Sequence, residues 1–73
     1  MEEAQLLKII GGNIASIRKE MGLSQMQLSS KCNMDKANIV RIENGKGNPT
    51  ISTLVRISNA LNVSPFLLLA PAP

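Results

Sequence analysis

Residues 24–44 contain two short helix-forming segments that only a three-residue turn, 33–35, separates. Ser24 and Gln27 form the Ser-x-x-Gln pattern that caps a helix N-terminus with two reciprocal hydrogen bonds. Asp35 is the expected N-cap of the second segment, because a short polar side chain can accept from the free N–H groups of the first helical turn. Two helices joined so closely must cross at a steep angle. The sequence therefore predicts a helix-turn-helix unit.

Three further helices are predicted around this unit. Apolar residues recur every three or four positions in the N-terminal segment, Gly22 is placed to end it, and Thr50 and Ser64 are the expected N-caps of the last two helices. No segment shows the two-residue alternation of a β-strand. The five expected helices are residues 4–20, 24–32, 35–44, 51–61 and 64–70. The predicted fold is all-α, a single five-helix domain that spans residues 1–73.

Two glycines, Gly11 and Gly12, lie in the middle of the first expected helix. Glycine destabilises a helix interior by about 1 kcal/mol relative to alanine. We therefore expect either a kink at this point or the close packing of another element against it.

The composition excludes most catalytic chemistry. Histidine is absent, so the commonest general base and the commonest metal ligand are missing. The five acidic residues show no metal-ligand spacing and Cys32 is the only cysteine, so no acid–base pair, metal cluster or disulfide is predicted. Phe66 is the only aromatic residue, which argues against the stacking platforms of single-strand binders. We expect no enzyme activity, no cofactor and no metal, and the free cysteine favours a reduced, cytoplasmic compartment.

The net charge of +3 understates how basic the body of the chain is. Glu2 and Glu3 lie at the extreme N-terminus, and the remaining residues carry eight basic against three acidic side chains. This excess suits an anionic partner such as nucleic acid, although many soluble proteins share it. No apolar stretch is long enough to span a bilayer, so no membrane partner is expected.

The second helix of the unit has one apolar and one polar face. At about 100° per residue, Ile39 and Ile42 fall on the core side. On the opposite, outer side lie Ala37, Arg41 and Asn44, with Lys36 and Val40 flanking them and Asn38 nearer the edge. The candidate base-reading residues of this helix are Lys36, Ala37, Asn38 and Arg41. Lys and Arg can donate to guanine O6 and N7, Ala and Val can contact a thymine methyl, and Asn can pair with adenine. The alternative is a merely solvated helix face; the flanking turn and caps favour the DNA-reading interpretation.

Several runs of residues resemble those of the Cro/cI repressor-like, XRE-type helix-turn-helix family. They are Gly22-Leu23-Ser24-Gln25 followed by Leu28, then Asn33-Met34-Asp35, Ile39-Val40-Arg41-Ile42-Glu43-Asn44-Gly45-Lys46 and Asn48-Pro49-Thr50. The resemblance covers about residues 9–68 and implies the five-helix lambda-repressor-like fold. Two positions depart from the family pattern: Ser29 stands where alanine is usual and Asn33 where glycine is usual. Because serine is small and asparagine tolerates a left-handed backbone, we expect the geometry to survive.

The resemblance also implies roles for individual residues. Gln25 would reach a base or a phosphate from the start of the first helix of the unit. Lys36, Ala37 and Arg41 would occupy the base-reading positions, and Ser24, Asn44 and Lys46 would meet DNA phosphates. Arg18 and Glu43 match a pair that forms a buried or half-buried salt bridge. Cys32 stands at an apolar core position, and we interpret it as a small buried hydrophobe rather than a redox sensor.

The last expected helix carries four bulky apolar residues in succession, 66–69. Such a run covers every side of a helix, so part of it is expected to be covered by another chain. Phe66, Leu67 and Leu69 are the expected dimer contacts, since related domains commonly dimerise through this region. The alternative is that the chain is a fragment whose apolar run covers a neighbouring domain; Met1 and the capped helices favour a complete small protein.

The sequence thus predicts a sequence-specific regulator of transcription that binds double-stranded DNA as a homodimer on an inverted-repeat operator. A phage-type repressor, a restriction–modification controller and an antitoxin-like autoregulator all fit the pattern. The alternative is a protein-interaction module of the same fold with little or no DNA binding. No small-molecule effector is expected, because 73 residues leave no second domain to hold one.

Overall fold

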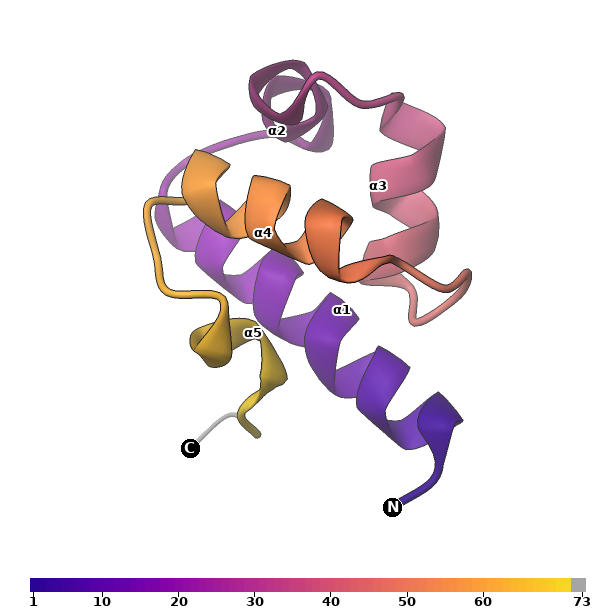
Figure 1. The fold of residues 1–73 in the computed structure, drawn as a ribbon. Helices are drawn as coiled ribbons and strands as arrows, with labels where there is room; N and C mark the ends of the chain where they lie inside the picture. Colours follow the sequence, from indigo (N-terminus) through magenta and orange to yellow (C-terminus); the bar gives the residue numbers. More distant parts are fainter. Residues whose placement is uncertain (72–73) are drawn as a thin grey trace.

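The computed structural model describes residues 1–71, which form five α-helices and no strand (Figure 1). The helices are α1 (Glu3–Glu20), α2 (Gln25–Cys32), α3 (Lys36–Glu43), α4 (Ile51–Ala60) and α5 (Phe66–Leu69). The all-α, five-helix architecture predicted from the sequence is therefore confirmed. Residues 72 and 73, which the expected domain includes, lie outside the described residues.

All five helices contribute to one apolar core. Each helix buries one or two apolar residues, and the C-cap of α4 adds another. The buried residues are Ile10 and Ile14 of α1, Leu28 and Cys32 of α2, Ile39 and Ile42 of α3, Leu54 and Ile57 of α4, its C-cap Leu61, and Leu68 of α5. The longest helix, α1, contacts both α3 and α5, whereas α2 contacts α3 and α4. Figure 1 views α2 nearly along its axis and α3 from the side, so the two helices cross steeply, as the short turn predicts.

The turn between α2 and α3 has the geometry that its residues predict. The Ser24 hydroxyl accepts from the backbone N–H of Gln27 at 3.0 Å, and the Gln27 side chain accepts from the N–H of Ser24 at 2.7 Å. Asn33 has φ 55°, the left-handed backbone that was expected for the residue that stands where glycine is usual. Ser29 is buried, and its hydroxyl donates to the carbonyl oxygen of Met26 at 2.8 Å, one turn back in α2.

The expected start of α3 is confirmed in position but not in its hydrogen bonding, and the expected start of α5 needs correction. Asp35 occupies the N-cap position of α3, but its carboxylate accepts no hydrogen bond from the first turn. The last helix begins at Phe66 and ends at Leu69, so it is shorter than the expected 64–70, and its N-cap is Pro65 and not the expected Ser64. Ser64 still accepts from the N–H of Phe66, at 3.3 Å. The expected cap of α4 is present, since the Thr50 hydroxyl accepts from the N–H of Thr53 at 3.1 Å.

The two glycines of α1 behave differently. Gly11 is buried against the C-terminal end of α3, where an added Cβ would lie 2.7 Å from the carbonyl oxygen of Glu43 and closer still to that of Ile42. Gly12 is exposed, and a Cβ there would meet nothing within 4 Å. The helix is continuous through both residues. Gly11 therefore permits close packing, which sets how the second helix of the unit sits on the rest of the domain.

Candidate nucleic-acid interface

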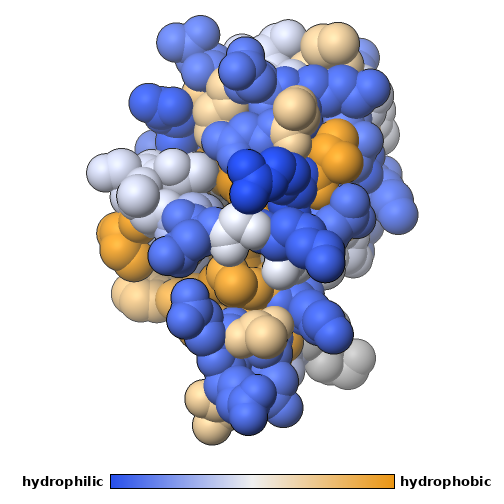
Figure 2. Space-filling view, turned by 90° about the vertical axis from the view of Figure 1, so that its right-hand side faces the viewer, coloured by the Kyte–Doolittle hydropathy of each residue, from blue (hydrophilic) through white to orange (hydrophobic). Residues whose placement is uncertain are grey.

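Helix α3 turns its polar side chains away from the core. Ile39 and Ile42 are buried, and Val40 is half-buried. The four candidate base-reading side chains of this helix, Lys36, Ala37, Asn38 and Arg41, are all exposed. Figure 2 looks onto the side of the molecule where α3 lies in Figure 1, and it shows mainly hydrophilic residues with isolated apolar ones. This face suits a polar partner better than an apolar one.

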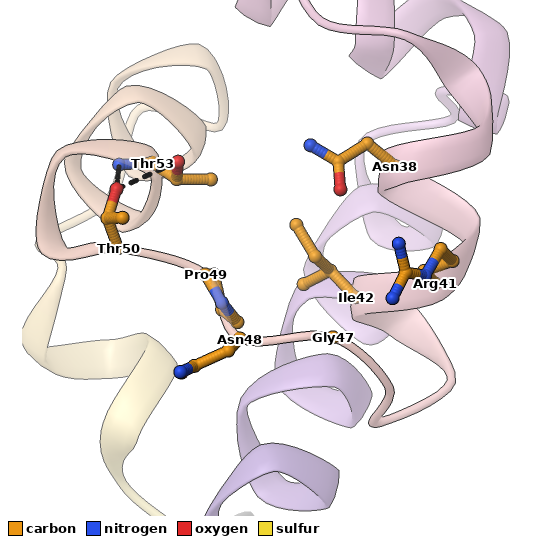
Figure 3. Close-up of a pocket in the computed structure, with 8 residues that line it drawn as sticks. All are labelled: Asn38, Arg41, Ile42, Gly47, Asn48, Pro49, Thr50 and Thr53. Atoms are coloured by element: carbon orange, nitrogen blue, oxygen red, sulfur yellow. Dashed lines mark hydrogen bonds between the residues drawn. The ribbon is translucent and has the colours of Figure 1, made fainter.

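Arg41 and Asn38 lie on the side of α3 that faces α4. They line an open pocket together with Ile42, the loop residues Gly47, Asn48 and Pro49, and Thr50 and Thr53 at the start of α4 (Figure 3). The Arg41 guanidinium lies over Gly47, so that a Cβ on this glycine would be 3.7 Å from Nη2. At about 100° per residue, Lys36 falls on the other side of α3 from Asn38. The two cations of α3 therefore flank its outer face.

The candidate phosphate-binding residues are also at the surface. Ser24, Asn44 and Lys46 are exposed, at the start of α2, at the C-cap of α3 and in the loop that follows. The Ser24 oxygen accepts from a backbone N–H within its capping box, which leaves its hydroxyl hydrogen available to donate. Gly45, with φ 73°, turns the chain between Asn44 and Lys46.

Arg18 and Glu43 form the ion pair that the resemblance implies. Arg18 Nε donates to Glu43 Oε2 at 2.7 Å and Nη2 donates to Oε1 at 3.0 Å, a two-point contact between side chains that are only 9% and 5% exposed. Arg18 Nη1 also donates to the carbonyl oxygen of Leu23 at 2.8 Å. The hydrogen bond to Glu43 raises the pKa of Arg18, and burial opposes that rise by a smaller amount. Glu43 is the only carboxylate within α3, and the buried Arg18 of α1 therefore compensates its charge.

Gln25 has a contact that sequence reasoning missed. Its side chain is half-buried, and its amide nitrogen Nε2 donates to Glu43 Oε1 at 3.0 Å. The two residues are 18 positions apart, so no local spacing pattern links them. The available signal was that Glu43, already expected to pair with Arg18, has two oxygens with room for more than one donor. The structure thus joins one candidate DNA contact, Gln25, to the buried ion pair.

The expected dimer contacts on α5 are exposed. Phe66 is 77% exposed, Leu67 54% and Leu69 39%, whereas Leu68 is fully buried in the core. Asn13, a residue that the sequence analysis did not single out, holds this helix in place: its side-chain amide donates to the carbonyl oxygen of Ala70 at 2.6 Å and to that of Leu68 at 3.0 Å. The amide of α1 therefore caps the C-terminal end of α5.

Within residues 1–71, no group of three or more Cys, Asp or Glu side chains is placed to hold a metal ion. Cys32 is buried and unpaired, and burial raises the pKa of its thiol. None of the five described helices has the length and apolar character needed to cross a membrane.

Comparisons with known proteins agree with this geometry. The family model HTH_3, described as helix-turn-helix, matches residues 14–68. The uncharacterized HTH-type transcriptional regulator y4dJ of Sinorhizobium fredii (strain NBRC 101917 / NGR234) is 34% identical over 64 residues, 88% of this chain and 83% of that protein. The immunity repressor protein of Bacillus phage phi105 is 39% identical over 54 residues, 74% of this chain and 38% of that protein. The crystal structure of the master regulator for biofilm formation SinR in complex with DNA has a TM-score of 0.78 at 39% identity, covering 84% of this chain and 98% of that one. These three relatives are named as regulators or repressors, in agreement with the expectation that the chain is not an enzyme.

Proposed function

The chain belongs to the HTH_3 helix-turn-helix family of transcriptional regulators, and from this premise we propose that it binds double-stranded DNA in a sequence-specific manner, as a homodimer on an inverted repeat. The observation that carries the proposal is the exposed polar face of α3, presented beside a steeply crossing α2. In this arrangement α3 enters the major groove and α2 crosses the DNA backbone. The SinR structure, solved with DNA, supports the same use of the fold.

The outer face of α3 reads the bases. Lys36 and Arg41 donate to guanine O6 and N7, and Ala37 contacts a thymine methyl. Asn38 pairs with adenine, since its exposed amide can both donate and accept. A helix rises about 1.5 Å per residue, so Lys36 and Arg41 are about 7.5 Å apart along the axis of α3. That span corresponds to about two base pairs at roughly 3.4 Å per step.

The backbone of the DNA meets a second set of residues. Ser24, Asn44 and Lys46 donate to phosphate oxygens from the two ends of the helix-turn-helix unit. Because these contacts carry no base information, they set the register of the protein on the duplex. Gln25, next to Ser24, contributes a base or phosphate contact at the same edge.

The dimer forms through the exposed apolar side chains of α5, Phe66, Leu67 and Leu69. A two-fold pair of domains places the two α3 helices about 34 Å apart, which matches half-sites separated by one helical turn of DNA. The protein acts in the cytoplasm, where a reducing environment keeps Cys32 free.

The proposed DNA contacts are tested by selecting bound duplexes from a random library and measuring affinities by fluorescence anisotropy at several salt concentrations. Arg41→Ala is expected to lose about 1–3 kcal/mol of discrimination at one base position. Lys46→Ala is the matched control: it should weaken binding to all sequences alike and reduce the salt slope by about 1. An unchanged base preference in Arg41→Ala would remove this residue from the reading set.

The dimer is tested by sedimentation equilibrium. Phe66→Ser is expected to shift the protein to monomer, whereas Met26→Ser, which removes a similarly exposed apolar side chain from α2, should leave the dimer intact. A wild-type dimer that binds no duplex in dilute buffer would contradict the DNA-binding proposal and would support instead a protein-interaction module of the same fold.

A further inference from the structure

Gln25 is the one proposed DNA contact in α2 or α3 whose side chain is bonded to a buried charged group. It is the first residue of α2, and its Nε2 donates at 3.0 Å to Glu43, the last residue of α3. The bond therefore joins the two ends of the helix-turn-helix unit, where the proposed phosphate contacts lie. The side chains of Lys36, Asn38 and Arg41, in contrast, are exposed.

The chemistry of this bond fixes which way the Gln25 amide points. An ionised carboxylate can only accept hydrogen bonds, so the amino group of Gln25, and not its carbonyl oxygen, must face Glu43. One N–H of Gln25 is engaged by this contact. Its Oε1 and its second N–H remain to meet the DNA, in one orientation instead of two.

Glu43 is itself held in place by Arg18 of α1. Both of its oxygens accept from Arg18, at 2.7 and 3.0 Å, and Arg18 also donates to the carbonyl oxygen of Leu23 at 2.8 Å. A chain of hydrogen bonds thus runs from the loop before α2, through two largely buried side chains, to the amide of Gln25. Because Arg18 compensates the charge of Glu43, this carboxylate can lie near DNA without strongly repelling phosphate.

We propose that Glu43 is a positioning residue for DNA binding: it orients the Gln25 carboxamide before the duplex arrives, and it acts through Gln25 without touching the DNA. A free glutamine side chain loses rotamer freedom when it binds, and fixing it in advance removes that cost from the binding step. The inference rests on the DNA binding proposed above, and it assigns to Glu43 a role beyond the ion pair with Arg18.

A double-mutant cycle on DNA affinity tests this role. Glu43→Gln, Gln25→Ala and the double variant are compared with the wild type on one selected duplex, by fluorescence anisotropy. If Glu43 acts through Gln25, Glu43→Gln weakens binding roughly tenfold in the wild-type background and less than about twofold when Gln25 is already alanine. The loss of a negative charge near DNA affects both backgrounds equally, so it cancels in the cycle. If Glu43→Gln weakens DNA binding by the same factor in both backgrounds, the positioning role is overturned and the proposed DNA binding is not.

A second measurement needs no variant of the ion pair, which matters if Glu43→Gln fails to fold. The side-chain amide of Gln25 in the free wild-type protein is expected to be rigid on the picosecond–nanosecond timescale, with an NMR order parameter of about 0.8. A value below about 0.6 would mean that the side chain is mobile, and would overturn the inference whatever the affinity of the protein for DNA. If the wild type binds no duplex, the proposed function fails, and the positioning role fails with it.

Discussion

Replacing Gly11 by alanine tests how α3 is seated on α1. Gly11 faces the C-terminal end of α3, and an added methyl group would lie 2.7 Å from the carbonyl oxygen of Glu43 and 2.9 Å from its carbonyl carbon. Ordinary contacts between carbon and these atoms are about 3.3–3.6 Å or longer. The neighbouring atoms belong to backbone, so relief requires α3 to move away from α1.

The expected loss of stability follows from two opposing effects. Alanine gains about 1 kcal/mol over glycine in a helix interior. Overpacking of a close contact costs about 1–3 kcal/mol or more, and here the displacement would also strain the ion pair between Arg18 and Glu43. Because the clashing atoms are backbone, the cost lies at the upper end of this range, about 3 kcal/mol, and the net expectation is that Gly11→Ala lowers the free energy of unfolding by about 2 kcal/mol. For a domain of this size that corresponds to a fall in Tm of about 8–16 °C.

Gly12→Ala is the matched control, one residue along the same helix. A Cβ at Gly12 meets nothing within 4 Å, so only the gain in helix propensity remains, about 1 kcal/mol or a rise of about 4–8 °C in Tm. Both variants are measured by circular dichroism, since the chain has no tryptophan to report unfolding. A single protein concentration is used, because the proposed dimerisation would make Tm depend on concentration. The reasoning is refuted if Gly11→Ala is as stable as the wild type.

Three other changes probe the rest of the domain. Burial raises the pKa of the Cys32 thiol in the folded state, and the charge of Arg56 opposes this by a smaller amount. The stability that comes from the neutral thiol is therefore complete below the pKa of the unfolded state and is lost as pH rises through the pKa of the folded state. Between about pH 8 and pH 10, the free energy of unfolding measured in urea titrations should fall less in Cys32→Val than in the wild type. An equal fall in the two proteins would contradict this expectation. Asn13→Ala removes the amide that caps α5 and should raise hydrogen exchange in α5 but not in α3, at a loss of about 1–2 kcal/mol. Thr50→Ala removes the cap of α4 and should lower the free energy of unfolding by about 1 kcal/mol, whereas Ser52→Ala, an exposed neighbour, should change it little.

Most of the fold could be predicted because residue types near each helix end determine where the helix begins and ends. The Ser24–Gln27 capping box and the left-handed Asn33 depend on neighbours within three or four positions, and both occur as expected. Asp35 shows the limit of such patterns: the residue type suits an N-cap, but solvent competes for an exposed carboxylate and the helix starts without its hydrogen bond. Sequence spacing alone likewise could not decide whether Gly11 or Gly12 supports a close contact, since that depends on where α3 lies.

For the candidate site, too, the features of a single helix could be predicted and the contacts between helices could not. Which side chains of α3 are exposed follows from about 100° of rotation per residue, and Lys36 and Arg41 are exposed as that rotation predicts. What the rotation cannot give is the distance between residues on different helices. Glu43 lies at the end of α3 that packs against Gly11 of α1, and there it contacts Arg18 and Gln25 together. A carboxylate at the end of a helix that is proposed to read DNA would by itself oppose binding. Once Arg18 neutralises it, the same carboxylate becomes a fixed acceptor at the edge of the interface, and that is why its partner Gln25 is the most informative residue to follow when DNA is added.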